Sequence, residues 1–485
     1  MFLGLDIGTS SVKAVIIDER GAVVDVASRP LEVSAPHPLW REQSPGDWLE
    51  ATIGAVDDLA KIDPRAVSEI RAIGLSGQMH GAVLLNGQGE VLRPAILWND
   101  GRSGHECQLM TEECPELTAI AGNLAMPGFT APKLLWVARN EPDIFARVAH
   151  VLLPKAYVRY RLTGEMVEDM SDASGTLWLD VGKRDWSERL LAVTGLRPST
   201  MPRLVEGSAA SGFLSADLTK RWGMAERVVV AGGAGDCAAS AIGLGAISAG
   251  DAFLSLGTSG VLFAVTDRFA PNPASAVHAF CHAIPDTWHQ MGVMLSSGEA
   301  LSWAAKVLGQ PEKDLLGSLG DRVAGPSTIQ FLPYLSGERT PHNDPGASGA
   351  FVGLSGATNR NDLVQAVLEG VAFATRDNLD ALAAAGTVLK GVDLVGGGSR
   401  SDLWAQIMAD VLGIPVTRVE EGEVGAALGA ARLGRLAATG ETPLAVCVKP
   451  KPIKTFSPRS DVHGAYVSAH ARWHRLYPAL KELRT

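Results

Sequence analysis

Two short Gly-Thr-Ser turns are the residues of this sequence whose chemistry points most directly to a ligand. The first is Gly8–Ser11 and the second is Gly257–Gly260, and each follows an apolar run. Glycine lets the backbone approach an anion, and successive N–H groups and the Thr and Ser hydroxyls can donate hydrogen bonds to phosphate oxygens. One such turn occurs in many hairpins, whereas two copies predict a phosphate chain held from both sides. The sequence contains no GxxxxGK[ST] segment, which excludes a P-loop protein.

The two turns differ at the position where charge matters. Asp6 precedes the first turn, at the place where the second copy has Ser255. A carboxylate beside bound phosphates is repulsive unless a cation intervenes, so Asp6 is a candidate Mg²⁺ ligand, directly or through water. The alternative is that Asp6 caps its own turn. Lys13 could reach the phosphates, but it lies at an alternating strand position, where a solvated lysine is an equal alternative.

Two further glycine-rich turns follow buried strands. Gly232–Gly235 follows the apolar run 228–231 and delivers Asp236 to the start of a helix. A carboxylate there can be a general base that accepts a hydroxyl proton during phosphoryl transfer, or simply a helix N-cap. Gly396–Gly398 follows the apolar run 392–395. It admits a close ligand or forms a plain strand-to-helix turn.

Composition limits the class of protein. The chain has 485 residues, so at least two domains are expected, and 46% hydrophobic with 20% charged residues is ordinary globular usage. The net charge of −10 disfavours nucleic acid as a partner. The N-terminus lacks the pattern of a signal peptide, and we find no apolar run long enough for a membrane span. Five scattered cysteines without a CxxC pair suggest reduced thiols, and we expect a cytoplasmic protein.

Strand-like and helix-like segments are mixed along the whole chain, which predicts an α/β fold. Strands are expected at 2–7, 14–18, 22–27, 70–75, 82–85, 228–231, 329–335 and 392–395. Helices are expected at 48–60, 134–137, 144–148, 157–162, 238–244, 298–308, 362–385 and 401–412.

An internal repeat is the strongest sign of domain organisation. Six of fourteen positions are identical when Leu5–Asp18 is placed over Leu254–Asp267, and each copy is expected to form strand, turn, strand. Chance similarity between two hairpins is the alternative. The repeat predicts two related domains, 1–246 and 247–485, which face each other across a cleft.

Several longer segments together resemble the FGGY family of carbohydrate kinases, and within it the branch that acts on xylulose. The resemblance covers nearly the whole chain. The segments that carry it are Gly128–Asn140, Gly349–Leu354 with Asp362–Glu369, Ser76–Gly81, Ala95–Asp100 and Tyr334–Pro341.

The resemblance implies two actin-like ATPase (ribonuclease H-like) domains that flank a central cleft. It implies ATP-dependent phosphorylation of D-xylulose to D-xylulose 5-phosphate, with ATP as co-substrate and Mg²⁺ as cofactor. Another ketose such as ribulose, or a non-sugar actin-like ATPase, stays open as an alternative. No nucleic acid or membrane partner is expected, and a homodimer stays open because the sequence does not determine the oligomeric state.

The resemblance also implies roles for individual residues. Asp236 would be the catalytic base and Asp6 would lie at the metal. The ketose would be contacted by Gln78, Met79, His80, Trp98, Asp236 and Cys237. The nucleotide would be held by Gly8, Thr9, Ser10, Ser11, Lys13, Gly257, Thr258, Ser259, Gly396, Gly397 and Gly398. Cys237 departs from the family, whose xylulose branch often has an amide residue at this position. Because a thiol is a poor hydrogen-bond partner, the sequence leaves open whether this sugar contact forms and which ketose binds.

Overall fold

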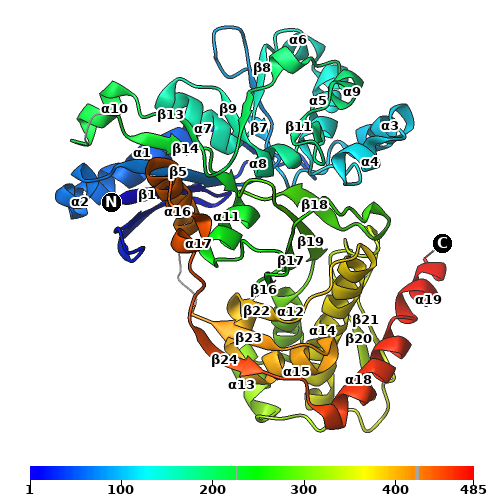
Figure 1. Ribbon diagram of the computed structural model, residues 1–485. Coiled ribbons are helices and arrows are strands. Elements are labelled where there is room, and N and C mark those ends of the chain that lie inside the picture. Colours follow the sequence, from blue (N-terminus) through cyan, green and yellow to red (C-terminus); the bar gives the residue numbers. More distant parts are fainter. Residues whose placement is uncertain (225–226, 421–424, 485) are drawn as a thin grey trace.

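The computed structural model describes residues 1–224, 227–420 and 425–484, and its two lobes are each built on a seven-stranded mixed sheet (Figure 1). The first sheet has the order β13-β14-β5-β1-β2-β3, and β15 pairs with β5 beyond the end of β14. Its strands are β1 (Phe2–Ile7), β2 (Ser11–Ile17), β3 (Val23–Pro30), β5 (Ala72–Gly77), β13 (Ala210–Phe213), β14 (Val229–Ala231) and β15 (Ala234–Gly235).

The second sheet has the order β18-β19-β17-β16-β22-β23-β24. Its strands are β16 (Ala252–Leu256), β17 (Gly260–Thr266), β18 (His278–Cys281), β19 (Trp288–Met294), β22 (Val392–Val395), β23 (Val416–Val419) and β24 (Pro452–Phe456).

The two sheets share one pattern of order and direction. In the first, β3-β2-β1 is antiparallel and β1-β5-β14 is parallel. In the second, β19-β17-β16 is antiparallel and β16-β22-β23 is parallel. The repeated segments predicted from the sequence are the β1–β2 and β16–β17 hairpins, at equivalent places in the two sheets.

Helix α16 (Gly425–Thr439) comes from the second half of the chain but packs on β1 and β5 of the first sheet. A Cβ on Gly4 or Gly74 would come within 2 Å of a carbonyl oxygen of α16, so only glycine permits this approach. Because this helix returns to the first lobe, the two lobes do not correspond to two continuous halves of the chain. The domain boundary between residues 246 and 247 therefore stays a prediction.

Helix α16 also packs on α11 (Asp236–Gly243), and small residues bring the two backbones together. A Cβ on Gly429 would lie 1.8 Å from the carbonyl oxygen of Ala239, and one on Gly243 would lie 2.3 Å from that of Gly425. Arg432 of α16 donates through Nη1 to the carbonyl oxygens of Ile242 and Gly243, at the C-terminus of α11. Helix α11, which begins at Asp236, is therefore fixed on α16 through its middle and its C-terminal end.

Each helix expected from the sequence overlaps a helix of the structure, and the bounds agree at 298–308, whereas most of the other ends differ. The strand expected at 329–335 is only β20 (Gln330–Leu332), and that at 14–18 begins earlier, as β2. The principal helices are α1 (Pro45–Ile62), α3 (Gly104–Glu113), α5 (Thr130–Asn140), α6 (Pro142–Phe145), α7 (Pro154–Thr163), α8 (Met170–Ser174), α12 (Gly298–Leu308), α13 (Glu312–Ser318), α14 (Arg360–Ala384), α15 (Asp402–Leu412), α18 (Ser460–Trp473) and α19 (Leu476–Glu482).

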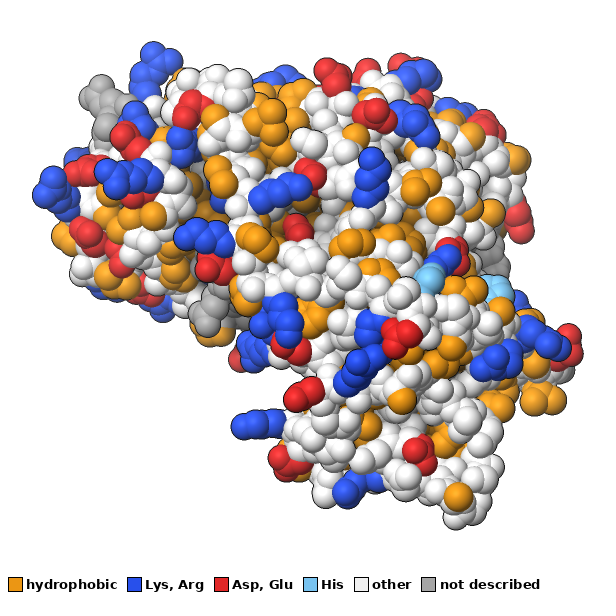
Figure 2. All heavy atoms as spheres, turned by 60° about the horizontal axis from the view of Figure 1, so that its bottom comes forward, with side chains coloured by type: hydrophobic (Ala, Val, Ile, Leu, Met, Phe, Trp, Pro, Cys, Tyr) orange, Lys and Arg blue, Asp and Glu red, His pale blue; other side chains and the backbone are white. Residues whose placement is uncertain are grey.

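The second lobe is built around the long helix α14. It begins with a capping box formed by Asn359 and Asp362, and its middle is buried among the largest apolar cluster of the chain. On the face in Figure 2, Lys and Arg side chains are interspersed with Asp and Glu. Among the described residues, no helix is long and apolar enough to cross a membrane.

Candidate active site

Three neighbouring parallel strands bring the predicted acidic residues to one edge of the first sheet. Asp6 of β1 lies beside Ser76 of β5, and Gly77 of β5 lies beside Gly235 of β15. Asp236 follows directly and begins α11. Parallel strands that end at the same edge place the residues after them close together. Asp6 and Asp236 are near enough that the charge of Asp6 raises the pKa of Asp236.

The Asp6 carboxylate has Ser76 and Lys13 as neighbours on the two adjacent strands. The Ser76 hydroxyl donates to Asp6 Oδ1 at 3.0 Å, and Lys13 is the cross-strand neighbour of Asp6 on β2. Burial raises the pKa of Asp6, while the Ser76 hydrogen bond and the charge of Lys13 act in the opposite direction. A carboxylate that burial destabilises in this way is suited to bind a cation.

Asp236 has the titration expected of a general base near neutral pH. Its pKa is raised to about 6, first by burial and second by the charge of Asp6. The Cys237 backbone N–H donates to Asp236 Oδ1 at 2.7 Å and acts to lower that pKa. At neutral pH Asp236 is mostly ionised and can accept a proton from a nearby hydroxyl.

The first Gly-Thr-Ser turn is hydrogen-bonded to two residues for which the sequence predicted contact with the sugar. The Trp98 indole N–H donates to the Thr9 hydroxyl at 3.0 Å, and that hydroxyl donates to Gln78 Oε1 at 3.0 Å. Gln43, which the sequence reasoning missed, donates through Nε2 to the carbonyl oxygen of Thr9 at 2.7 Å and accepts from Gln78 Nε2 at 3.0 Å. One hydrogen-bonded network therefore joins the phosphate turn to Gln78 and Trp98. The Trp98 side chain stays substantially exposed, so its ring is free to stack on a ligand.

Met79 and His80 follow β5, and the Met79 side chain faces Gly235, directly before α11. His80 has a left-handed backbone, with φ of 69°, which is strained for a residue other than glycine. Its Nδ1 lies 2.6 Å from the carbonyl oxygen of Gly175, which can only accept, so Nδ1 carries the proton. Burial lowers the pKa of His80 to about 3. The imidazole is therefore neutral, and Nε2 is an acceptor for a hydroxyl. The Met79 side chain lies within 3 Å of the Cβ position of Gly235, so glycine is required there.

The segment Gly128–Asn140 explains how His80 keeps its strained backbone. Lys133 donates to the carbonyl oxygens of His80 at 2.9 Å and Gly128 at 2.8 Å, and the Thr130 hydroxyl donates to the His80 carbonyl at 3.1 Å. Lys133 is fully buried and no described carboxylate pairs with it, and burial holds its pKa well below the usual range. The sequence marked this segment only by resemblance, because lysine in an apolar helix gives no sign of its partner.

Helix α8 and the residues around it link Asp236, His80 and the second lobe. The Ser171 hydroxyl accepts from the Gly235 backbone N–H at 3.1 Å, directly before Asp236. Gly175 accepts from His80, and the Ser174 hydroxyl accepts from the backbone N–H of Cys281 on β18 at 3.0 Å. None of these three was singled out in the sequence, because their role depends on contacts distant along the chain.

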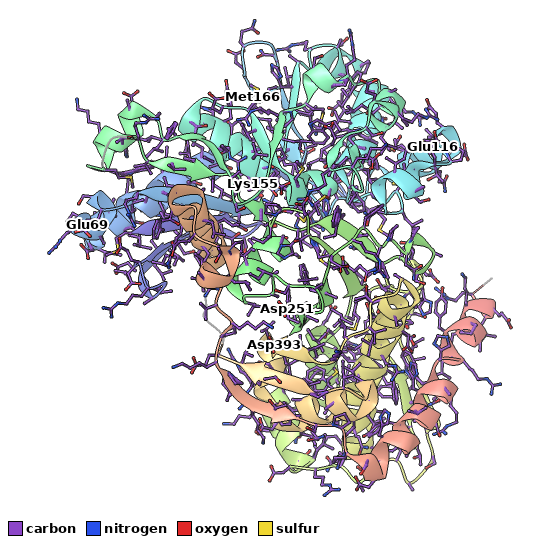
Figure 3. The ribbon with its side chains drawn as sticks, in the orientation of Figure 1. Glu69, Glu116, Lys155, Met166, Asp251 and Asp393 are labelled. Atoms are coloured by element: carbon purple, nitrogen blue, oxygen red, sulfur yellow. The ribbon has the colours of Figure 1, made fainter. Side chains whose placement is uncertain are left out.

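A buried charge cluster supports this segment from behind. Lys155, near the middle of the first lobe, pairs with Glu168 at 2.5 Å, Asp169 at 2.7 Å and Asp172 at 3.4 Å (Figure 3). Burial and the neighbouring carboxylates, including Asp236, raise the pKa of Asp172 well above its ordinary value. Asp169 in turn caps α8 by accepting from the backbone N–H groups of Ser171 and Asp172.

The second Gly-Thr-Ser turn and the Gly396–Gly398 turn meet at the ends of the adjacent strands β16 and β22. They line a cavity of about 760 Å³, a size that accommodates a nucleotide. The residues that line it include Trp404 of α15, Lys313 of α13, and Gly257, Thr258, Gly397, Gly398 and Arg400. The sequence left the contribution of Arg400 open, and the structure puts it in this cavity.

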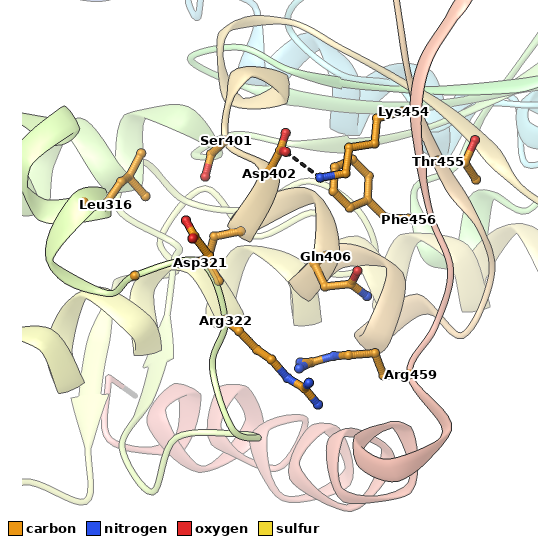
Figure 4. Close-up of a pocket in the computed structure, with 13 residues that line it drawn as sticks. Leu316, Asp321, Arg322, Ser401, Asp402, Gln406, Lys454, Thr455, Phe456 and Arg459 are labelled. Carbon is orange, nitrogen blue, oxygen red and sulfur yellow. Dashed lines mark hydrogen bonds and ion pairs between the residues drawn. The ribbon is translucent and has the colours of Figure 1, made fainter.

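A second cavity, of about 750 Å³, adjoins the first (Figure 4). Leu316 and Ser401 line both cavities. Lys454 donates to Asp402 at 2.7 Å in its wall, and Arg459 pairs with Asp410 at 2.7 Å. These cations already have carboxylate partners, so this second cavity presents little unbalanced charge.

A cavity of about 370 Å³ lies between the two lobes, beside Cys237. Cys237 lines it from α11, Ser255 from β16, and Gly396 from the turn after β22. It therefore extends from the residue after Asp236 to the strand before the second Gly-Thr-Ser turn and to the start of the Gly396–Gly398 turn. Burial, followed by the charge of Asp236, raises the pKa of the Cys237 thiol well above its ordinary value, so the thiol is protonated.

The second lobe also reaches the region of His80. Arg339 donates through Nη1 to His278 Nε2 at 3.3 Å, and the opposite ring nitrogen of His278 donates to Asn123 Oδ1 at 3.0 Å. The charge of Arg339 contributes to the low pKa of His80. Among the described residues Arg339 has no carboxylate partner. Sequence reasoning missed Arg339, although it lies in Tyr334–Pro341, one of the segments that carried the resemblance.

The predicted residues thus form two groups, one in each lobe. The first group lies at one edge of the first sheet and comprises Asp6, Lys13, the first turn, Gln78, Met79, His80, Trp98, Asp236 and Cys237. The second group comprises the second turn and Gly396–Gly398. His282, whose contact with ligand the sequence left open, is fully buried beside Phe263 and His289, apart from both groups.

Comparisons with known proteins agree with this geometry. Residues 1–243 match the model of the FGGY family of carbohydrate kinases, N-terminal domain, and residues 252–438 match that of the C-terminal domain. A xylulose kinase from Escherichia coli K12 is 49% identical over the full length of both chains. The crystal structure of a xyloylose kinase from Brucella ovis is 54% identical with a TM-score of 0.98, and that of a xylulose kinase from Rhodospirillum rubrum is 30% identical with a TM-score of 0.93; each comparison covers 99% of both chains.

Proposed function

The chain belongs to the FGGY family of carbohydrate kinases, and we propose that it transfers the γ-phosphoryl group of ATP to the terminal hydroxyl of D-xylulose. The products are ADP and D-xylulose 5-phosphate. The observation that carries this proposal is the full-length similarity to xylulose kinases together with Asp236, whose pKa is raised to about 6, at the edge where the predicted sugar and phosphate residues gather.

The sugar is proposed to bind beside β5. His80 offers a neutral Nε2 as an acceptor for a hydroxyl, and Gln78 is oriented by the same network that holds Thr9. Trp98 offers an exposed ring for the sugar to pack on. Met79 fills the space between this region and Gly235, which positions the terminal hydroxyl toward Asp236.

The nucleotide is proposed to lie in the 760 Å³ cavity of the second lobe, with its phosphates directed toward both Gly-Thr-Ser turns. Asp6, a half-buried carboxylate that accepts from the Ser76 hydroxyl, offers the oxygen donors that Mg²⁺ prefers, so the residues present fit this cation. When bound, Mg²⁺ supplies charge neutralisation for the phosphate oxygens. Lys13, opposite Asp6, adds a positive charge on the same side.

Asp236 is proposed to accept the proton of the attacking hydroxyl as the O–P bond forms and the bond from the γ-phosphorus to the bridging oxygen of ADP breaks. The Cys237 N–H holds the carboxylate, and Ser171 holds the preceding peptide, so the base is pre-positioned. Backbone N–H groups of the two turns stabilise the charge that develops on the transferring group. Closure of the two lobes would exclude water and limit ATP hydrolysis.

Cys237 bears on the choice of ketose. Its thiol is protonated and lies between Asp236 and the interlobe cavity, so it offers a weak donor where the family's xylulose branch often has an amide. We expect Cys237→Asn to change the sugar KM more than the ATP KM. An unchanged sugar KM would show that the residue at this position does not touch the sugar.

The direct test is ADP release measured with pentuloses, hexuloses, polyols and glycerol, with the phosphorylated product identified. The proposal predicts the highest kcat/KM for D-xylulose and phosphate on its terminal hydroxyl. Equal ADP release with and without sugars would instead indicate an actin-like ATPase. A preference for ribulose would retain the phosphotransfer and change the substrate.

Three further expectations accompany the proposal. The chain is expected to comprise domains 1–246 and 247–485, which limited proteolysis within residues 244–251 would test. A homodimer stays open and is resolved by light scattering of the purified chain. Use of ATP as co-substrate is consistent with a cytoplasmic location, which fractionation tests.

A further inference from the structure

A group of metal-ligating side chains lies on the second lobe, among residues that the proposed function does not use. His470 and His474 are on α18 and its C-cap, and Asp377 is on α14. One ligand atom from each of the three lies within 4.8 Å of the others. His470 Nε2 is 2.8 Å from Asp377 Oδ1, and His474 Nδ1 is 3.1 Å from the same oxygen.

The spacing of the two histidines places them on one face of a helix. They are four residues apart, and the backbone N–H of His474 donates to the carbonyl oxygen of His470 at 2.8 Å, so the helical turn continues to His474. Two histidines at this spacing can bind one metal ion, with a third ligand from another element. Asp377 supplies that third ligand from the neighbouring helix.

The distances are close to those that a coordinated ion requires. Metal bonds of about 2.0–2.2 Å to nitrogen and oxygen put neighbouring ligand atoms about 3.3–3.6 Å apart at the tetrahedral angle. The two nitrogen-to-oxygen separations, 2.8 and 3.1 Å, are shorter than this range by about 0.5 and 0.2 Å. Only small side-chain rotations would therefore open the group to an ion.

The two helices are fixed to one another independently of this group. The Tyr466 hydroxyl donates to Glu369 Oε1 at 3.0 Å, which joins α18 to α14. The Trp473 indole donates to the carbonyl oxygen of Phe331 at 2.7 Å, and His470 stacks on Trp473. Ligands on packed helices are held in place before an ion arrives, which reduces the entropic cost of binding.

The group is also open to solvent on one side. The Asp377 side chain is 3% exposed, that of His470 is 17% exposed and that of His474 is 58% exposed. An ion can therefore enter past His474, and water can complete its coordination. Asp380, about one turn along α14, also lies near His474, and its carboxylate is paired with Arg376 at 2.8 Å.

From this juxtaposition we propose that Asp377, His470 and His474 bind one divalent transition-metal ion of the Zn²⁺, Co²⁺, Ni²⁺ class. Two imidazoles and one carboxylate suit these ions, whereas Mg²⁺ prefers an all-oxygen set. Binding ties α18 to α14 and stabilises the second lobe. None of the three residues lines the cavities described above, so we do not expect the site to take part in phosphoryl transfer.

The test uses the full-length chain without a histidine tag, freed of metal by EDTA and then dialysed. Zn²⁺ is titrated calorimetrically in the presence of excess Mg²⁺, which occupies oxygen-only sites, and Co²⁺ is titrated by visible absorption. The variants are His470→Gln and His474→Gln. The matched control is His105→Gln, which removes an exposed helical histidine of α3.

We expect the parent and the control to bind one equivalent of Zn²⁺, and each ligand variant to bind it more than about 100-fold more weakly. Zn²⁺ should raise the thermal midpoint of the parent and the control but not of the two variants. Activity with Mg²⁺ and ATP should be the same in all four proteins at saturating substrate.

Two results would overturn the proposal. One is that the parent shows no Zn²⁺ or Co²⁺ binding under these conditions. The other is equal binding by the parent and both ligand variants. If the variants lower the midpoint of the metal-free protein while Zn²⁺ leaves the parent midpoint unchanged, the three side chains form a hydrogen-bonded contact only.

Discussion

Replacing Asp236 with asparagine should make the protein more stable at neutral pH. Asparagine keeps the size of the side chain and an oxygen that can accept from the Cys237 N–H, but it removes the charge. The folded state raises the pKa of Asp236 from an ordinary value of 3.8 to about 6, mainly through burial and then through Asp6. The ionised carboxylate is thus held in an environment that disfavours it, as expected for a site built for reaction.

The magnitude follows from the size of that shift. A difference of about two pKa units corresponds to about 2–3 kcal/mol of destabilisation above pH 6. A carboxyl group with a raised pKa binds more protons in the folded state than in the unfolded state. The penalty is therefore complete above about pH 6 and disappears as the pH falls toward about 4. The gain from Asp236→Asn should follow the same pH window.

The assay is thermal unfolding of the ligand-free chain, with EDTA present so that no divalent ion relieves the charge. At about pH 8 the midpoint of Asp236→Asn should exceed that of the parent by about 2–3 °C, because the unfolding of 485 residues carries an entropy of about 1 kcal/mol/K. The matched control is Asp185→Asn, which removes an exposed carboxylate of the same lobe and should leave the midpoint nearly unchanged. Equal midpoints at about pH 8, or a gain that persists unchanged at about pH 4, would refute the reasoning.

Three other variants test the architecture of the site. Lys133→Met should raise the sugar KM about 5- to 100-fold with little change in the ATP KM, because the strained backbone of His80 loses its support; an unchanged sugar KM would contradict this. Ser171→Ala should lower kcat about tenfold with both KM values retained, because the peptide before the catalytic aspartate loses its partner, and Ser171→Thr should recover part of the loss. In thermal unfolding, Gly429→Ala should destabilise the protein by about 1–3 kcal/mol because its Cβ would meet a carbonyl oxygen at 1.8 Å, whereas Gly464→Ala, with open space around it, should be neutral or slightly stabilising.

The sequence predicted those parts of the fold whose signal is local. The repeat around Gly8 and Gly257 identified two equivalent hairpins, and these occupy equivalent central places in two sheets. Apolar periodicity predicted α12 and β22 with the bounds that the structure has. The packing of α16 on the first sheet was not predictable in this way, because its cause is a set of glycines distant along the chain, such as Gly4 and Gly74.

The candidate site shows the same division. Glycine-rich turns after strands pointed to Asp236 and to the cavity of the second lobe. The supporting residues were missed because their meaning depends on partners: Lys133 on the carbonyl of His80, Ser171 on the peptide of Gly235, and Arg339 on His278. The sequence shows such a residue only as a polar or charged side chain, and its type does not reveal which atom it holds.

The central claim is that Asp236 accepts the proton of a sugar hydroxyl as ATP phosphorylates it. The most direct measurement is the turnover of the Asp236→Asn chain with ATP and D-xylulose, followed both by ADP release and by formation of the sugar phosphate. We predict that kcat falls about 10²- to 10⁴-fold while the sugar KM changes little and the folded structure is retained. Turnover near that of the parent chain would contradict the mechanism.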